Sequence, residues 1–111
     1  MSRRYRTIIS RNAEDDLIEI LEYYNARNGM YSQKFLSAFE KKIEELKEFP
    51  ERGRTVPELE KQNILEYREL IEGNYRIIYA VENKNVIIHA IIDSRRNLDE
   101  LLVKKLLRMY S

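Results

Sequence analysis

The chain has 111 residues, which suits a single domain. Its 20 basic and 19 acidic side chains leave a net charge of +1, so its total charge does not indicate a polyanionic partner. It has no cysteine, which excludes disulfide bridges, thiolate metal sites and a cysteine nucleophile and is typical of a reducing cytosol. The longest apolar run, 86–92, is far shorter than the ~20 residues of a membrane helix, and no secretory signal is recognisable, so we expect a cytoplasmic protein without membrane contact.

The N-terminal segment predicts a strand followed by a helix. Residues 3–9 form a short alternating pattern, and either Ser10 or Asn12 can cap the helix that follows. Acidic residues at 14–16 place negative charge at the positive end of the helix dipole. The apolar positions recur at helical spacing and form one stripe: Ala13, Leu17, Ile20, Leu21 and Tyr24.

A second helix follows closely. Asn28 and Gly29 both tolerate a left-handed conformation, so they predict the C-terminal cap of the first helix. Ser32 is the predicted N-cap of the second helix, which Pro50 ends. Its buried side comprises Phe35, Phe39, Ile43 and Leu46. Two helices with so short a connection predict an antiparallel hairpin, and residues 50–63, which hold both prolines, predict a loop.

The second half of the chain changes to a strand pattern rich in Ile, Val and Tyr. Three strands are predicted at 65–71, 75–82 and 85–93, separated by two-residue turns at 73–74 and 83–84, which makes an antiparallel meander. A capping box beginning at Asn97 predicts a C-terminal helix. We therefore predict one α+β domain over residues 1–111, a helical hairpin packed on a small antiparallel β-sheet in the order β-α-α-β-β-β-α.

The single histidine, His89, is the main candidate for proton transfer. A Ser/His/Asp triad is disfavoured because the nearest partners lie on one strand and its end, and no Asp/Glu cluster has a metal-ligand spacing, so no metal or cofactor is expected. Strict alternation places His89 and Asp93 on one face of the last strand. A structural histidine in a mostly buried strand is favoured over a proton-transfer group on an exposed face.

Arginines are the more informative candidates. Four on or beside the predicted strands would converge on one side of the sheet: Arg68, Arg76, Arg95 and Arg96. Arg76 lies in the central strand and must pair with a carboxylate or face water, because an unpaired buried guanidinium is costly. A converging cluster would bind phosphate or carboxylate bidentately. The equal alternative is that Arg68 and Arg76 form ion pairs with Glu66, Glu69 or Glu72. Arg54 in the loop would enlarge a basic patch.

Four segments in this order resemble the RelE/ParE toxin superfamily of type II toxin–antitoxin, or plasmid stabilisation, systems: FPERGRTVPE (49–58), YREL (67–70), GNYRIIY (73–79) and IIDSRRN (91–97). The resemblance covers nearly the whole chain. It implies a helical hairpin on an antiparallel sheet. It also implies a cognate antitoxin that forms a hetero-oligomer with the toxin.

Activity divides within this superfamily, since RelE-like members cleave mRNA on the ribosome and ParE-like members poison DNA gyrase. For the nuclease branch, the resemblance implies phosphate contacts from Arg76 and Arg95 and proton transfer by His89 or Glu58. The lysines that precede the Tyr-Arg motif in RelE are absent, and the final RelE tyrosine is replaced near Leu101.

The loop at 53–58 is closer to ParE. The resemblance therefore favours a ParE-like gyrase inhibitor that is not an enzyme. The arginines expected to contact its target are Arg54, Arg68, Arg76, Arg95 and Arg96. An mRNA interferase, which is an endoribonuclease, is the alternative. A further alternative is an attenuated toxin acting mainly in a repressor complex with its antitoxin.

Overall fold

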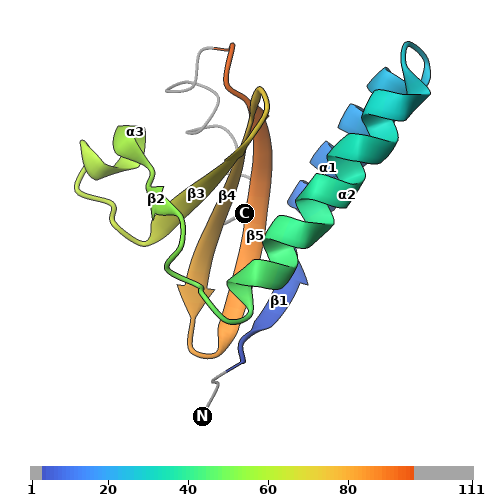
Figure 1. Cartoon of the computed structure of the whole chain (residues 1–111). Coiled ribbons are helices and arrows are strands. Elements are labelled where there is room, and N and C mark those ends of the chain that lie inside the picture. Colours follow the sequence, from blue (N-terminus) through green and yellow to red (C-terminus); the bar gives the residue numbers. More distant parts are fainter. Residues whose placement is uncertain (1–3, 97–111) are drawn as a thin grey trace.

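The computed structural model describes residues 4–96, so the predicted C-terminal helix lies outside the described residues (Figure 1). Two long helices lie against one side of a sheet, and a short helix lies on the other side of its far edge. The elements in chain order are β1 (Arg6–Ile9), α1 (Arg11–Asn25), α2 (Gly29–Leu46), β2 (Arg54–Thr55), α3 (Pro57–Glu60), β3 (Tyr67–Glu72), β4 (Tyr75–Glu82) and β5 (Asn85–Asp93).

The helical hairpin is confirmed, but both ends of its connection differ from the prediction, because α1 already ends at Asn25 and α2 already begins at Gly29. Ser10 caps α1, because its hydroxyl accepts a hydrogen bond from the amide of Ala13 at 3.1 Å. Asn28 does not close α1. Its side chain accepts from the amide of Tyr31 at 3.2 Å and so caps the start of α2. Ser32, the predicted cap, is instead buried within α2 and donates to the carbonyl of Leu21.

The predicted apolar stripes of both helices form the larger core. Side chains of α1 and α2 pack on one face of the sheet against β4 and β5. The buried members are Ala13, Ile20, Phe35, Phe39, Ile43, Leu46, Tyr75, Ile77, Tyr79, Val86, Ile88 and Ile91. We call this side the hairpin face.

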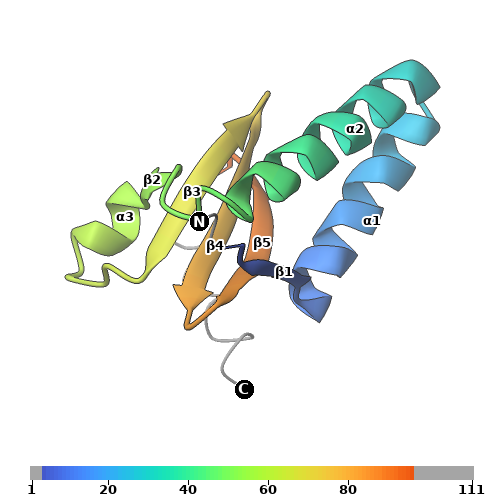
Figure 2. The ribbon, with the colours of Figure 1, turned by 60° about the horizontal axis from the view of Figure 1, so that its bottom comes forward.

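Within residues 4–96 the sheet has five strands in the order β1-β5-β4-β3-β2. The antiparallel meander β3-β4-β5 is confirmed, with its two-residue turns closed by left-handed Gly73 and Asn83. β1 pairs in parallel with β5, from Arg6 opposite Asn85 to Ile9 opposite Ile88. The sheet is therefore mixed, and Figure 2 shows β1 at one edge and β2 at the other.

The segment predicted as a loop at 50–63 contains ordered structure. β2 pairs with β3, and α3 places Val56 and Leu59 in a second, smaller core on the opposite side of the sheet. Its other members are Tyr67, Ile78, Ala80, Ala90 and Ile92. We call this side the α3 face. No helix among the described residues is long and apolar enough to cross a membrane.

Candidate functional site

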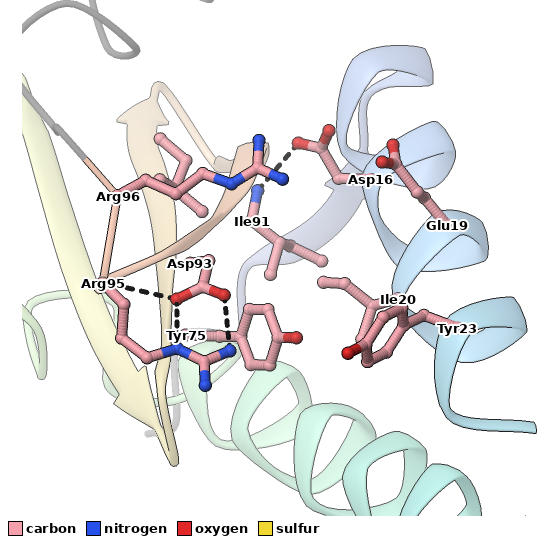
Figure 3. A pocket seen from close by; sticks show the side chains of 10 residues that line it. Asp16, Glu19, Ile20, Tyr23, Tyr75, Ile91, Asp93, Arg95 and Arg96 are labelled. Carbon is pink, nitrogen blue, oxygen red and sulfur yellow. Dashed lines mark hydrogen bonds and ion pairs between the residues drawn. The ribbon is translucent and has the colours of Figure 1, made fainter. Parts of the chain in front are cut away.

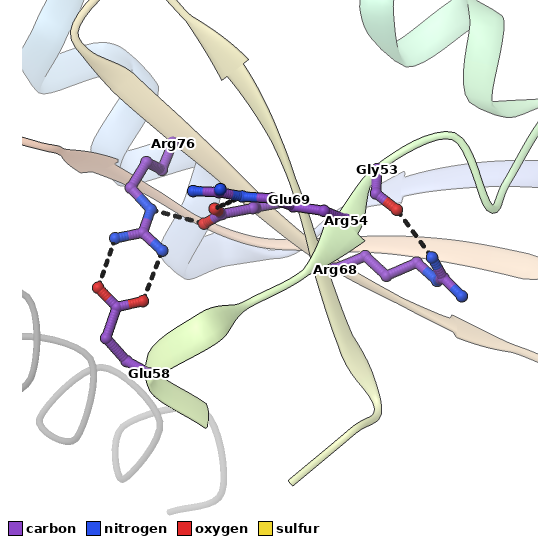
Figure 4. Close-up of polar contacts among 6 residues, drawn as sticks. All are labelled: Gly53, Arg54, Glu58, Arg68, Glu69 and Arg76. Atoms are coloured by element: carbon purple, nitrogen blue, oxygen red, sulfur yellow. Dashed lines mark hydrogen bonds and ion pairs between the residues drawn. The ribbon is translucent and has the colours of Figure 1, made fainter. Parts of the chain in front are cut away.

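Arg76 lies on the α3 face at the centre of a four-residue ionic network (Figure 4). Its two terminal nitrogens donate to the two oxygens of Glu58, each at 2.7 Å, and its Nε donates to Glu69. The other oxygen of Glu69 accepts from Nε of Arg54 at 2.7 Å. Two guanidinium groups thus face two carboxylates, and the network carries no net charge. We call these four residues the Arg76 network.

Burial differs sharply within the Arg76 network. The side chains of Glu69 and Arg76 are 0% and 6% exposed, whereas Arg54 is 63% exposed. The hydrogen bonds from Arg76 hold the pKa of Glu58 below its usual range, and the same bonds raise the pKa of Arg76. Both groups therefore stay ionised at neutral pH. The carboxylate-paired alternative is confirmed for Arg76 with Glu69, while the sequence did not predict the pairing with Glu58.

Arg68 does not join Arg76. It lies opposite Tyr79, a residue of the hairpin face, and its guanidinium donates to the carbonyl of Gly53 at 2.8 Å. Figure 4 shows its side chain directed away from the Arg76 network. The prediction that the arginines converge on one side of the sheet is wrong, because strand alternation places Arg68 and Arg76 on opposite faces.

His89 is the extra residue of an irregularity in the β4–β5 pairing, where Ile78 pairs with Ala90 and the next residue, Tyr79, pairs with Ile88. This bulge reverses the alternation of β5. His89 consequently packs edge-on against Tyr67 of the α3 face, with ring centroids 5.5 Å apart. Asp93 lies opposite Tyr75 on the hairpin face, so the prediction that His89 and Asp93 share a face is wrong.

The environment of His89 opposes protonation. Its side chain is half-buried, and burial lowers its pKa below the ordinary value for histidine. Its backbone carbonyl accepts hydrogen bonds from the hydroxyl of Ser10 and the amide of Asn12, at 3.3 and 2.7 Å. The start of α1 thereby supplies the hydrogen-bond donors for this carbonyl.

Arg95 and Arg96 line an open cleft of about 270 Å³ between α1 and the end of β5 (Figure 3). We call it the α1–β5 cleft. Arg95 chelates Asp93 through Nε and a terminal nitrogen, at 2.9 and 2.7 Å, and holds the pKa of that carboxyl below its usual range. The remaining residues that line the α1–β5 cleft are Asp16, Glu19, Ile20, Tyr23, Tyr75, Ile91 and Ile92.

No sequence pattern predicted the α1–β5 cleft. Asp16 was interpreted only as a negative charge favoured by the helix dipole. In the structure it is 8% exposed and accepts a hydrogen bond from the amide of Ile91 at 3.0 Å. An acidic residue one helical turn before Ile20 on the buried stripe was the available signal, because such a side chain needs a donor.

The candidate nuclease residues therefore fall into two groups. Glu58, Arg76 and His89 lie on the α3 face, and Arg95 lies at the α1–β5 cleft on the other side. Among residues 4–96, no group of three or more His, Cys, Asp and Glu side chains is arranged to hold a metal ion.

A family model described as the ParE toxin of type II toxin–antitoxin system, parDE, matches residues 7–98. That match spans most of the chain and includes every element of the described fold apart from the first residue of β1. The chain therefore belongs to the family of ParE toxins of type II toxin–antitoxin systems. No curated protein sequence matches the chain.

Two solved structures share this fold. A chain of the chromosomal ParDE toxin–antitoxin system from P. aeruginosa is 20% identical, with a TM-score of 0.64 over 83% of this chain and 98% of that chain. A chain of the toxin–antitoxin complex RelBE2 from Mycobacterium tuberculosis is 16% identical, with a TM-score of 0.58 over 84% of this chain and 94% of that chain. At these identities the likeness shows the fold alone, and it agrees with the predicted RelE/ParE-like architecture.

Proposed function

We propose that the chain inhibits growth in the cytoplasm by binding DNA gyrase, and that a cognate antitoxin neutralises it in a hetero-oligomer. The family supports the toxin and antitoxin parts of this proposal. The observation that carries the choice of gyrase over RNA cleavage is the state of Arg76, whose three guanidinium nitrogens are all engaged by Glu58 and Glu69.

RNA cleavage through the 2′-hydroxyl needs a base, an acid and cations within reach of one phosphate. Glu58 holds both terminal nitrogens of Arg76, which leaves only the second N–H of each for a phosphate. Arg95 cannot supply the second cation at that place, because it lies at the α1–β5 cleft. A toxin that acts by binding needs no such convergence. The exposed arginines, Arg54 and Arg95 above all, are then contacts for the target, and Arg68 and Arg96 extend them.

Supercoiling by purified gyrase tests the proposal. The wild-type protein is expected to inhibit the reaction or to stabilise cleaved DNA. Arg95→Ala combined with Arg96→Ala is expected to weaken inhibition about tenfold, while Lys61→Ala, at an exposed position on the other side, keeps full potency. Supercoiling that continues unchanged at a large excess of wild-type protein rejects gyrase as the target.

The alternative is a RelE-like mRNA interferase. One observation favours it, namely that Glu58, Arg76 and His89 share the α3 face. Primer extension on translated mRNA after induction separates the two functions. New cleavage sites that disappear in His89→Gln would support the interferase, and their absence together with growth arrest would support gyrase. Unaffected growth without the antitoxin would instead indicate an attenuated toxin that serves in a repressor complex.

A further inference from the structure

The α1–β5 cleft combines an apolar floor with two charged rims (Figure 3). Ile20, Tyr75 and Ile91 form the floor and are buried in the larger core. Tyr23 forms the α1 wall of the cleft and is 50% exposed. The guanidinium carbon of Arg27 lies 3.8 Å from the centroid of its ring. Tyrosine is enriched among the residues that dominate protein interfaces, so an exposed tyrosine beside an apolar floor is typical of a binding surface.

Charge at the rims is of both signs. Three carboxylates and two guanidinium groups line the cleft, and Arg95 is already paired with Asp93. Glu19 on α1 and Arg96 beyond β5 are exposed, and neither makes an ion pair within residues 4–96. Because carboxylates outnumber arginines, the cleft does not favour a polyanion such as RNA or DNA. A protein segment carrying both signs of charge satisfies both rims.

The backbone edge beside the cleft is largely closed. β1 pairs with β5 only as far as Ile88, and side chains of α1 cap the next polar groups of β5. Asp16 accepts from the amide of Ile91, and Asn12 donates to the carbonyl of His89. A docking segment is thus held mainly by its side chains and not by adding a strand to the sheet. The volume, about 270 Å³, lies below the roughly 300–1,000 Å³ of cofactor sites and suits one large side chain with its neighbours.

We propose that the α1–β5 cleft is the docking site for a segment of the cognate antitoxin that carries one large apolar side chain between a basic and an acidic one. The apolar side chain packs on Ile20, Tyr75 and Ile91 beside Tyr23. The basic side chain pairs with Glu19, and the acidic one pairs with Arg96. This inference rests on the proposed function for the existence of the antitoxin.

The test measures binding of the full chain to the purified product of the reading frame encoded beside it. Tyr23→Ala is expected to raise Kd about tenfold, because it removes the aromatic wall. Glu19→Lys and Arg96→Glu are each expected to raise Kd about threefold to tenfold, with a larger effect at low salt. Matched charge reversals at exposed positions outside the cleft, Lys61→Glu and Glu66→Lys, are expected to change Kd less than twofold.

The possible outcomes distinguish failure of the proposed docking site from failure of the proposed toxin–antitoxin pair. Equal affinity for wild type and all three cleft variants overturns the docking site but leaves the toxin–antitoxin pair intact. No binding of the wild-type chain to the neighbouring product overturns both. Loss of gyrase inhibition in the cleft variants at unchanged antitoxin affinity assigns the cleft to the target instead. If Arg96→Glu weakens binding of a single-stranded RNA oligonucleotide at unchanged antitoxin affinity, the occupant of the cleft is nucleic acid and not the antitoxin segment. Thermal melting of each variant identifies any loss caused by unfolding.

Discussion

The hairpin face and the α3 face of the sheet are covered by different means. On the hairpin face, two helices of 15 and 18 residues present long apolar stripes, so burial of apolar side chains is their main contact with the sheet. On the α3 face, α3 has four residues and cannot be stable by itself. It is fixed by Val56 and Leu59 and by the bidentate pairing of Glu58 with Arg76. A short covering element therefore depends on ionic contacts that a long helix does not need.

The same difference separates two arginines that sequence patterns treat alike. Arg76 is buried and joins α3 to the sheet, whereas Arg95 is 61% exposed and bonds only with its neighbour Asp93 among the described ion pairs. One arginine is part of the architecture, and the other is available at the surface. Four measurements can break or sharpen this comparison.

Removing Arg76 should have the largest effect. Arg76→Ala leaves Glu69 fully buried with only the exposed Arg54 as partner, so we expect the free energy of unfolding to fall by about 3–5 kcal/mol in urea denaturation. Replacing both members of the buried pair, Arg76→Met with Glu69→Leu, should recover most of the loss. A loss below about 1 kcal/mol for Arg76→Ala would show that the pair faces water in solution and would reject its structural role.

Gly53 directly precedes β2 and lies close to Glu69 of β3 and Tyr79 of β4. An added Cβ would be 2.5 Å from the carbonyl oxygen of Glu69 and 2.7 Å from the hydroxyl of Tyr79. Since that hydroxyl also accepts the amide hydrogen of Gly53, Gly53→Ala should destabilise the protein by about 1–3 kcal/mol by denaturant unfolding. Gly29→Ala is the matched control. It meets open space at the start of α2 and should be neutral or slightly stabilising.

Acid should weaken the α3 face through His89. Burial lowers the folded-state pKa of His89, so the unfolded chain binds a proton that the folded protein excludes. The contribution of His89 is therefore complete above the unfolded pKa of about 6.5 and is lost as pH falls below it, with a slope of at most about 1.4 kcal/mol per pH unit. Unfolding measured at pH 7.5 and 5.5 should show this loss, and His89→Gln should reduce it.

Arg95→Ala should have the smallest effect on stability. Because this side chain is exposed, the melting temperature should remain that of the wild type. The pKa of Asp93 should instead rise toward its ordinary value, since the hydrogen bond from Arg95 is the main cause of its lowering. A pH titration of the Asp93 carboxyl by NMR measures the change. A clear drop in melting temperature would place Arg95 among the structural arginines.

Much of the fold followed from local pattern, and the errors came from residues whose role depends on distant partners. Helical spacing identified the buried stripes, and the two-residue turns identified the meander. Asn28 was assigned to the wrong helix end because asparagine suits either cap, and only its bond to Tyr31 decides between them. The parallel pairing of β1 with β5 had no local signal at all.

The candidate site was less predictable for the same reason. A carboxylate partner for Arg76 was foreseen within β3, but Glu58 reaches it from α3, a segment predicted as a loop. One bulge at His89 reversed the alternation on which the pairing with Asp93 depended. Strand alternation is reliable only between irregularities, and a sequence does not mark where a single extra residue is inserted.

The contact between Ser10 and His89 joins positions 79 residues apart, and β1 beside it needs β5 as its strand neighbour. During synthesis, β1 leaves the ribosome first but cannot pair until residues 85–88 have also emerged. The sheet is thus completed only when most of the chain has been translated. The α1–β5 cleft, which needs residues 91–96, forms only after these residues have also left the ribosome.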